Sequence, residues 1–117
     1  MTVEAKVAQI LTTLTLAITA GSGQGVKVGD TAVVSSRVEV HDPDTGEVLG
    51  DVPVAKVRAK VTSVQARICV AKVTDTYMYL ARKYLKTLTD DPELADYRSV
   101  YLAPGDIVQI EDDEPPF

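Results

Sequence analysis

Apolar and polar residues alternate over most of the first 73 positions, and this two-residue period constrains the fold more than any other feature of the sequence. Val, Ile and Thr are abundant there, and β-branched residues favour extended structure. The pattern predicts strands whose alternate side chains point to opposite faces of a sheet. The predicted strands cover residues 3–7, 14–18, 31–40, 54–64 and 66–73.

Turn residues separate these strands. The glycine-rich loop (residues 21–25, GSGQG) follows the second strand, and glycine lowers the cost of a positive φ. After the third strand, Asp42 can accept a backbone hydrogen bond, Pro43 presets φ and Gly46 accepts a left-handed conformation. Short strands at this regular spacing predict a mainly β fold, a small antiparallel β-barrel of six or seven strands.

The period changes after residue 73. Apolar residues then recur at the three- and four-residue spacing of an amphipathic helix, which we expect over 74–88 with Thr74 or Asp75 as its N-cap. Extended structure resumes at 100–102, and 107–110 is the last predicted strand. We therefore expect a single domain, 1–110, that carries a helical insert at 74–102 and is followed by an acidic tail at 111–117.

Charge and composition exclude several classes. The 117 residues carry 12 Lys+Arg and 17 Asp+Glu, a net charge of −5 that argues against a general binder of nucleic acid or anionic membranes. One cysteine permits no disulfide within the chain. Residues 1–20 lack the uninterrupted apolar core of a signal peptide, so we expect a cytoplasmic protein. A chain from which a signal peptide had been removed would instead belong to the envelope or periplasm.

Two short segments resemble each other, around Gly29-Asp30 and around Gly105-Asp106. In each, we expect the glycine to adopt a positive φ and the aspartate to accept backbone N–H bonds across a corner that leads into a strand. A common turn type explains both corners, and a duplicated unit is the alternative.

These corners belong to a longer series of motifs. The chain reads GVKVGD at 25–30, DPDTGEVLG at 42–50, VTSVQ at 61–65 and PGDIV at 104–108. In this order they resemble the C-terminal β-barrel domain of flagellar assembly protein T and related small barrels of bacterial envelope proteins. The resemblance covers about residues 3–73 and 103–110, whereas the family lacks the insert. It implies a non-enzymatic barrel used for assembly or interaction, and no catalytic residue is carried over.

Motifs for catalysis or ligand binding are weak. The Asp42–Gly46 segment is better interpreted as a hairpin turn than as a calcium loop, because the twelfth position of such a loop would be Pro53. The glycine-rich loop precedes a strand, whereas a phosphate cradle needs a helix N-terminus. Cys69 lies in a predicted strand, where a buried inert thiol is the ordinary case, and His41 is the only histidine. We therefore expect no enzyme activity, no metal site and no cofactor.

One strand carries a basic stripe. Lys56, Arg58 and Lys60 alternate with apolar residues, and Arg37 is expected on a neighbouring strand. Small barrels bind single-stranded nucleic acid through such faces, but residues 1–76 contain no aromatic residue on which a base could stack. A solvated face is the simpler interpretation. Docking of an acidic partner, including the acidic tail of another copy, is the alternative.

The insert is where we expect function, because loops on a rigid scaffold commonly carry binding. The predicted partner-binding residues are apolar or aromatic: Tyr77, Leu80, Tyr84, Leu88 and Tyr97. They predict an assembly module that binds a protein partner or itself. The alternatives are a helix that plugs one end of the barrel, or a small-molecule sensor with its ligand in the barrel mouth. An enclosed apolar pocket would favour the sensor and an exposed Tyr/Leu patch would favour assembly.

Overall fold

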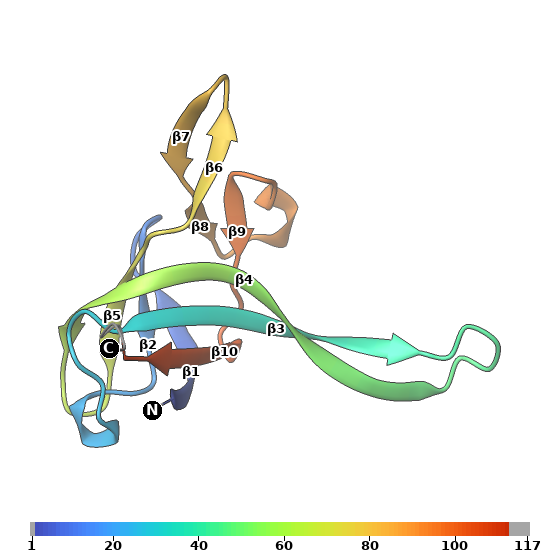
Figure 1. Ribbon diagram of the computed structural model, residues 1–117, viewed down its shortest axis with the longest axis horizontal. Helices are drawn as coiled ribbons and strands as arrows, with labels where there is room; N and C mark the ends of the chain where they lie inside the picture. The colour runs from blue at the N-terminus through green and yellow to red at the C-terminus, as the bar shows by residue number, and fades with distance from the viewer. Residues whose placement is uncertain (1, 113–117) are drawn as a thin grey trace, which may run out of the picture.

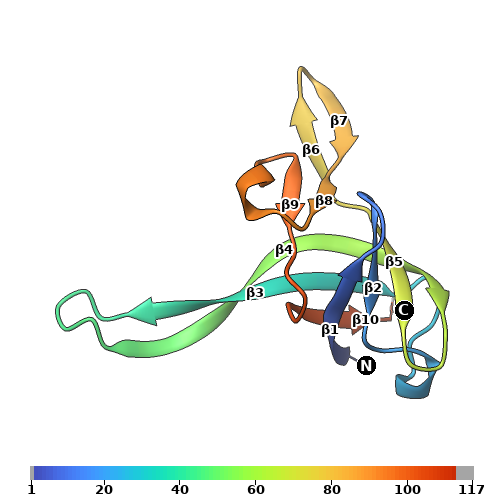
Figure 2. The same cartoon turned by 180° about the vertical axis from the view of Figure 1, so that it is seen from behind.

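Six antiparallel strands close into a ring in this computed structural model, which describes residues 2–112 (Figures 1 and 2). The order around the ring is β1-β10-β3-β4-β5-β2. The strands are β1 (Thr2–Ile10), β2 (Thr15–Ile18), β3 (Thr31–His41), β4 (Val48–Val64), β5 (Cys69–Val73) and β10 (Ile107–Glu111). The prediction of a mainly β chain is confirmed, although β4 begins at Val48 where the sequence predicts residue 54, and β5 begins at Cys69 where it predicts residue 66.

The interior of the ring is the hydrophobic core. Along β3 and β4, Val34 pairs with Val57 and Ala32 with Ala59, and all four side chains are buried. Val33 and Arg58, the residues between them, pair with each other on the outer face, as the two-residue period predicts. Closure leaves the six strands without a free edge where they pair around the ring, which avoids exposed unpaired backbone groups.

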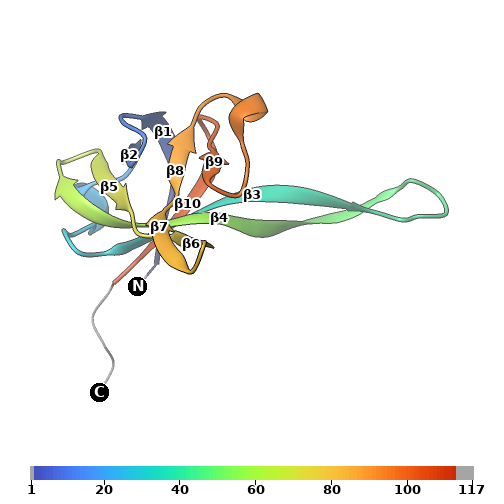
Figure 3. The ribbon, with the colours of Figure 1, turned by 90° about the horizontal axis from the view of Figure 1, so that it is seen from above.

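Two strands run far beyond the ring. β3 pairs with β10 only over residues 31–35, and β4 pairs with β5 only over 59–64. From the Ser36–Val54 pair outward, the two strands pair only with each other, up to a turn at residues 42–47. We call residues 36–54 the arm. It projects from one side of the ring as a two-stranded ribbon (Figures 1 and 3).

The predicted helix over 74–88 is wrong. The segment forms the strands β6 (Thr76–Tyr79) and β7 (Arg82–Leu85), which pair as an antiparallel hairpin. β8 (Thr87–Thr89) then pairs in parallel with β9 (Ser99–Tyr101). Helical structure among the described residues consists of two 3₁₀ segments, η1 (Ser22–Gln24) and η2 (Pro92–Leu94), and no helix is long and apolar enough to cross a membrane.

The error has a geometric cause. Tyr77 and Tyr84 are seven residues apart, which places two side chains on one face of a helix. The same separation places them opposite each other in a hairpin with a two-residue turn, and the structure pairs them in this way. Leu80 and Ala81 form that turn with φ of 52° and 61°, values that Gly and Asn adopt more readily. No turn residue in the sequence therefore indicates the hairpin.

The insert is attached to the core of the ring. Leu88 of β8 and Leu102, which follows β9, are both buried with the ring residues. The Leu88 N–H donates to the carbonyl of Thr13, 2.7 Å away, so β8 is also bonded to the β1–β2 turn. The β6–β7 hairpin projects beyond this base and away from the ring (Figure 1). Of the predicted acidic tail, 113–117 lies outside the described residues.

The two Gly-Asp corners have the same geometry. Gly29 and Gly105 have φ of 97° and 96°, and the carboxylates of Asp30 and Asp106 each accept a hydrogen bond from the N–H three residues earlier, at 2.9 and 3.0 Å. In the second corner, Asp106 also forms an ion pair of 2.7 Å with Lys56 of β4. This pair connects the corner to the ring.

Candidate protein-binding surface

Three tyrosines gather at the base of the β6–β7 hairpin. The Tyr77 and Tyr84 rings stack as cross-strand partners, with centroids 5.7 Å apart. The Tyr97 ring meets Tyr77 edge-on at 5.5 Å, although it comes from the segment between η2 and β9. Both arrangements are favourable for aromatic pairs. The cluster therefore joins the hairpin to the second half of the insert.

Asp96 holds the Tyr97 segment in place. Its carboxylate accepts backbone N–H bonds from Arg98 and Ser99 at 2.7 and 3.0 Å and a side-chain bond from Arg98 at 3.1 Å. These bonds, led by the Arg98 backbone N–H, lower the pKa of Asp96. The Arg98 guanidinium also lies over the Tyr97 ring, 5.5 Å from its centroid. This ring is thus fixed on a surface that solvent still reaches.

The rest of the hairpin exposes apolar side chains together with positive charge. Leu80 at the turn is 79% exposed, and Met78, Tyr79 and Leu85 are exposed as well. Between residues 76 and 86 there are three basic residues and no acidic one. Tyr77, which is half-buried, lies with Tyr79, Arg82 and Tyr84 on one face of the hairpin, and Met78, Lys83 and Leu85 lie on the other face. We call these residues, together with Leu80 at the turn and Tyr97, the hairpin patch.

Four of the five predicted partner-binding residues lie in the hairpin patch, and the fifth does not. Tyr77, Tyr84 and Tyr97 are brought together, and Leu80 lies at the turn of the same hairpin. Leu88 is only 4% exposed and packs in the core, so its prediction as a contact residue is wrong. In the predicted helix it lay on the face of Tyr84, whereas in the structure it belongs to a separate strand that covers the ring.

The predicted basic face is divided. Lys56 is mostly buried, where its ammonium donates to Asp106 and to the Tyr101 carbonyl at 2.7 and 3.1 Å. Arg37 lies on the arm and pairs with Asp51 at 3.1 Å. Arg58 and Lys60 lie on the outer face of β4, in the part of that strand that forms the ring. The four cations therefore do not form one continuous stripe.

The glycine-rich loop uses its backbone donors internally. The N–H groups of Ser22 and Gly23 donate to the carbonyls of Gln65 and Ala66 at 2.8 and 3.0 Å, and those of residues 24–26 donate within the loop. No helix of useful length follows, so the loop lacks the free N–H groups that a phosphate cradle needs. Its role in the structure is to pack against the β4–β5 connection.

The turn at the tip of the arm is closed by its own hydrogen bonds. The Asp42 carboxylate accepts the N–H of Asp44 at 2.8 Å, the Asp42 carbonyl accepts the N–H of Gly46 at 2.8 Å, and Gly46 has φ of 74°. This is the hairpin turn that the sequence predicts. Among residues 2–112, no group of three or more His, Cys, Asp or Glu side chains is arranged to hold a metal ion.

The thiol of Cys69 is buried in the core. Burial, and to a smaller extent the negative charge of Asp30, raises the pKa of Cys69 to about 11. At neutral pH it is therefore a protonated, weakly nucleophilic group. His41 lies on the arm, where Nδ1 is 3.2 Å from the Gly46 carbonyl and Nε2 is 3.3 Å from Glu39. The structure does not bring these two side chains together as a catalytic pair.

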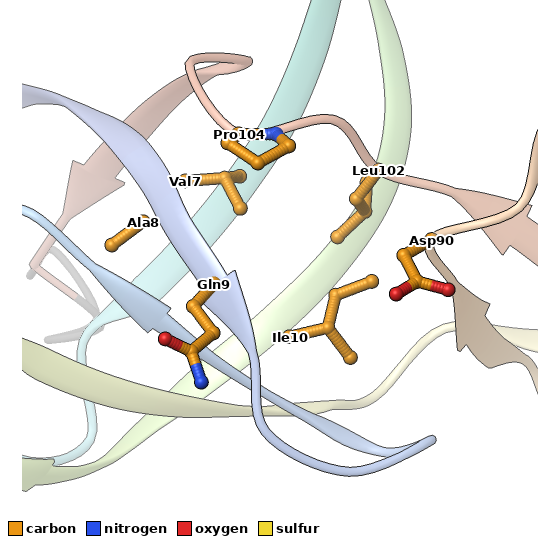
Figure 4. A pocket seen from close by; sticks show the side chains of 7 residues that line it. All are labelled: Val7, Ala8, Gln9, Ile10, Asp90, Leu102 and Pro104. Atoms are coloured by element: carbon orange, nitrogen blue, oxygen red, sulfur yellow. The ribbon is translucent and has the colours of Figure 1, made fainter.

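A shallow pocket of about 370 Å³ lies where the insert meets β1 (Figure 4). Val7, Ile10 and Leu102 form its apolar side, and Gln9 and Asp90 are its polar residues. Ala8, Gln9, Asp90 and Pro104 are exposed, so much of the lining borders solvent. The pocket is a surface depression beside the ring, whereas the interior of the ring is filled by the core.

Sequence reasoning missed part of the exposed surface. The predicted contact residues do not include Met78 and Tyr79, although both lie in the Tyr-rich insert; alternation in the hairpin exposes both of its faces. The valines of the arm were also missed, although their two-residue period is visible in the sequence. No family model and no curated protein sequence matches this chain.

Proposed function

We propose that this chain is a non-catalytic assembly module that self-associates through the hairpin patch. The observation that carries the proposal is the exposure of Leu80, Met78, Tyr79 and Tyr84 on an element that the core of the ring does not need. Exposed apolar patches rimmed by charge are typical of protein interfaces, and Tyr and Met are enriched there.

The construction of the insert supports the same function. Leu88 and Leu102 attach it to the ring, and the tyrosine cluster stiffens the hairpin above them. An interface that is ordered before binding loses less conformational entropy when it binds. Residues 3–73 and 103–110 resemble small barrels of flagellar assembly proteins, and that resemblance also implies a role in assembly. We therefore propose that this chain is an assembly barrel of that kind.

Binding of a small molecule beside β1 is the second candidate, supported by the pocket in Figure 4. A ligand site normally surrounds its ligand and supplies a few converging polar groups. Only Gln9 and Asp90 offer polar side chains here, and both are exposed. We therefore place assembly first.

The test compares the mass of the protein in solution with that of hairpin-patch variants. Sedimentation velocity at concentrations from 5 to about 500 μM should show oligomers, and the double variant Leu80→Ser/Tyr84→Ser should weaken association at least about tenfold because it removes central apolar contacts. Val28→Ser is the matched control, since Val28 is exposed outside the insert. A wild-type protein that stays monomeric throughout this range would contradict the proposal.

A further inference from the structure

The arm carries an apolar face that nothing in the described chain covers. Val38 pairs with Val52 across the two strands, and Val40 and Val54 lie on the same side of the ribbon. These four valines are between 43% and 47% exposed. A two-stranded ribbon is only marginally stable alone in water, and exposing an apolar face to water is a further unfavourable contribution to its free energy.

The register shows where this face comes from. Along β3, Val38 and Val40 have the same parity as Val34, which is buried in the core. The register with β4 shifts between Val34 and Ser35, and beyond this shift Val52 and Val54 of β4 lie on the side of Val38 and Val40. The opposite side of the arm carries Glu39, Asp51 and Arg37, and Arg37 pairs with Asp51. The valine side of the arm therefore suits contact with an apolar surface, and the opposite side suits contact with water.

Charge restricts what can cover this face. Between residues 36 and 54 one arginine accompanies five carboxylates, so the arm carries a net charge of −4 with His41 neutral. Two arms placed together would repel each other, and a polyanion such as nucleic acid would be repelled as well. A suitable partner surface is apolar and positively charged.

The hairpin patch has both properties. Arg82 and Lys83 give it two positive charges, and Leu80, Met78 and Tyr79 are exposed. Lys86, which lies outside the patch, is paired with Asp75 at 3.9 Å. The hairpin and the arm of one chain point in different directions from the ring (Figures 1 and 3), so the arm cannot lie along the hairpin of its own chain as folded. A second copy supplies the complementary surface.

We propose that the arm of one copy docks by its valine face on the hairpin patch of a second copy. The inference rests on the proposed function and names the partner of the hairpin patch. Because the two surfaces differ, the contact is heterologous, and repetition gives a closed ring of subunits or an open filament. The carboxylates at the tip of the arm, Asp42, Asp44 and Glu47, then lie near Arg82 and Lys83, which steers association and fixes its direction.

Charge exchange between variants tests this pairing. Asp44→Lys/Glu47→Lys reverses the sign at the arm tip, and Arg82→Glu/Lys83→Glu reverses it on the hairpin. Each variant alone should associate at least about tenfold more weakly than wild type by sedimentation velocity at low salt, because like charges then meet. An equimolar mixture of the two, and the single chain that carries all four changes, should regain association because opposite charges meet again.

The apolar part of the contact has its own variant. Val38→Ser/Val52→Ser removes a cross-strand pair from the exposed face and should weaken association at least about tenfold, whereas Val28→Ser should leave it unchanged. Circular dichroism and urea midpoints of every variant establish that the ring is folded.

The outcomes separate the two proposals. If Leu80→Ser/Tyr84→Ser weakens association while the arm variants do not, the arm is not the partner and the proposed function stands. The same conclusion follows if Leu80→Ser/Tyr84→Ser weakens association and the mixture of the two charge variants fails to regain association. If the arm variants weaken association while all hairpin variants leave it unchanged, both the pairing and the role of the hairpin patch are wrong. A monomer under all conditions rejects both.

Discussion

Gly21 lies where there is no room for a side chain. It is buried where the glycine-rich loop passes the β4–β5 connection, and a Cβ there would lie 2.1 Å from the Gln65 carbonyl oxygen and 2.8 Å from the Ile68 nitrogen. Backbone atoms cannot move aside as a flexible side chain would. The loop that looked like a ligand cradle is therefore a packing contact.

We predict that Gly21→Ala lowers the free energy of unfolding by about 2–3 kcal/mol, the usual cost of forcing an extra carbon into a packed site. Urea denaturation measures it. Gly50→Ala is the control, because nothing lies within 4 Å of a Cβ at Gly50 and its φ is ordinary; its effect should stay within about 0.5 kcal/mol. Equal effects of the two substitutions would show that the loop does not pack as described.

Cys69 gives a prediction that depends on pH. Because burial raises the pKa of its thiol from 9.0 to about 11, the folded state binds a proton that the unfolded state releases between these values. The resulting stabilisation is complete below pH 9 and is lost as the pH rises towards 11. The urea midpoint of wild type should therefore fall relative to that of Cys69→Ala over this interval. At pH 8, a disulfide reagent should modify the native thiol far more slowly than the denatured one, and equal rates would contradict the prediction.

At the scale of elements, the β6–β7 hairpin is held by its cross-strand pairs against an unfavourable turn. Ala81 has φ of 61°, and an L-residue in this region costs roughly 1 kcal/mol relative to glycine. Ala81→Gly should remove that cost and slow amide exchange in residues 76–85 about fivefold, as measured by NMR. Ala8→Gly is the control: Ala8 lies in β1 without a positive φ, so glycine there should speed exchange nearby. Faster exchange in the Ala81→Gly hairpin would mean that this turn is not formed.

The same elements show how far sequence reasoning reaches. The ring strands could be predicted because burial on one face imposes a two-residue period, as along Ala32 and Val34, and the corners could be predicted because only a few residues tolerate their backbone angles. The β6–β7 hairpin could not be predicted, since the seven-residue separation of Tyr77 and Tyr84 suits a helix and a two-residue hairpin equally, and Leu80-Ala81 gives no turn signal. The sequence pattern predicts a solvated Lys56 and does not reveal its partner Asp106, which is 50 positions away in the chain. Such pairings are decided by tertiary structure.

At the scale of the whole molecule, the arm lies apart from the hydrophobic core. All buried core residues lie outside residues 37–53, so the arm adds no side chain to the core of the ring. It instead exposes apolar side chains that contribute nothing to the core of a monomer. An element that costs solubility and contributes little to folding is explained most simply by contact with another molecule.

This separation predicts the behaviour of a chain without the arm. Replacing residues 37–53 by Asn-Gly joins Ser36 to Val54, which already face each other across the two strands, through a turn suited to a two-residue hairpin. The free energy of unfolding should change by no more than about 1 kcal/mol, because the core is intact, while sedimentation velocity should show only monomers. In a mixture, the shortened chain still presents its hairpin patch, so it should bind the arm of a wild-type copy and end the growth of the assembly. Its addition should therefore shorten wild-type oligomers in proportion to its concentration. Unchanged oligomers in that mixture would show that the arm and the hairpin patch do not meet.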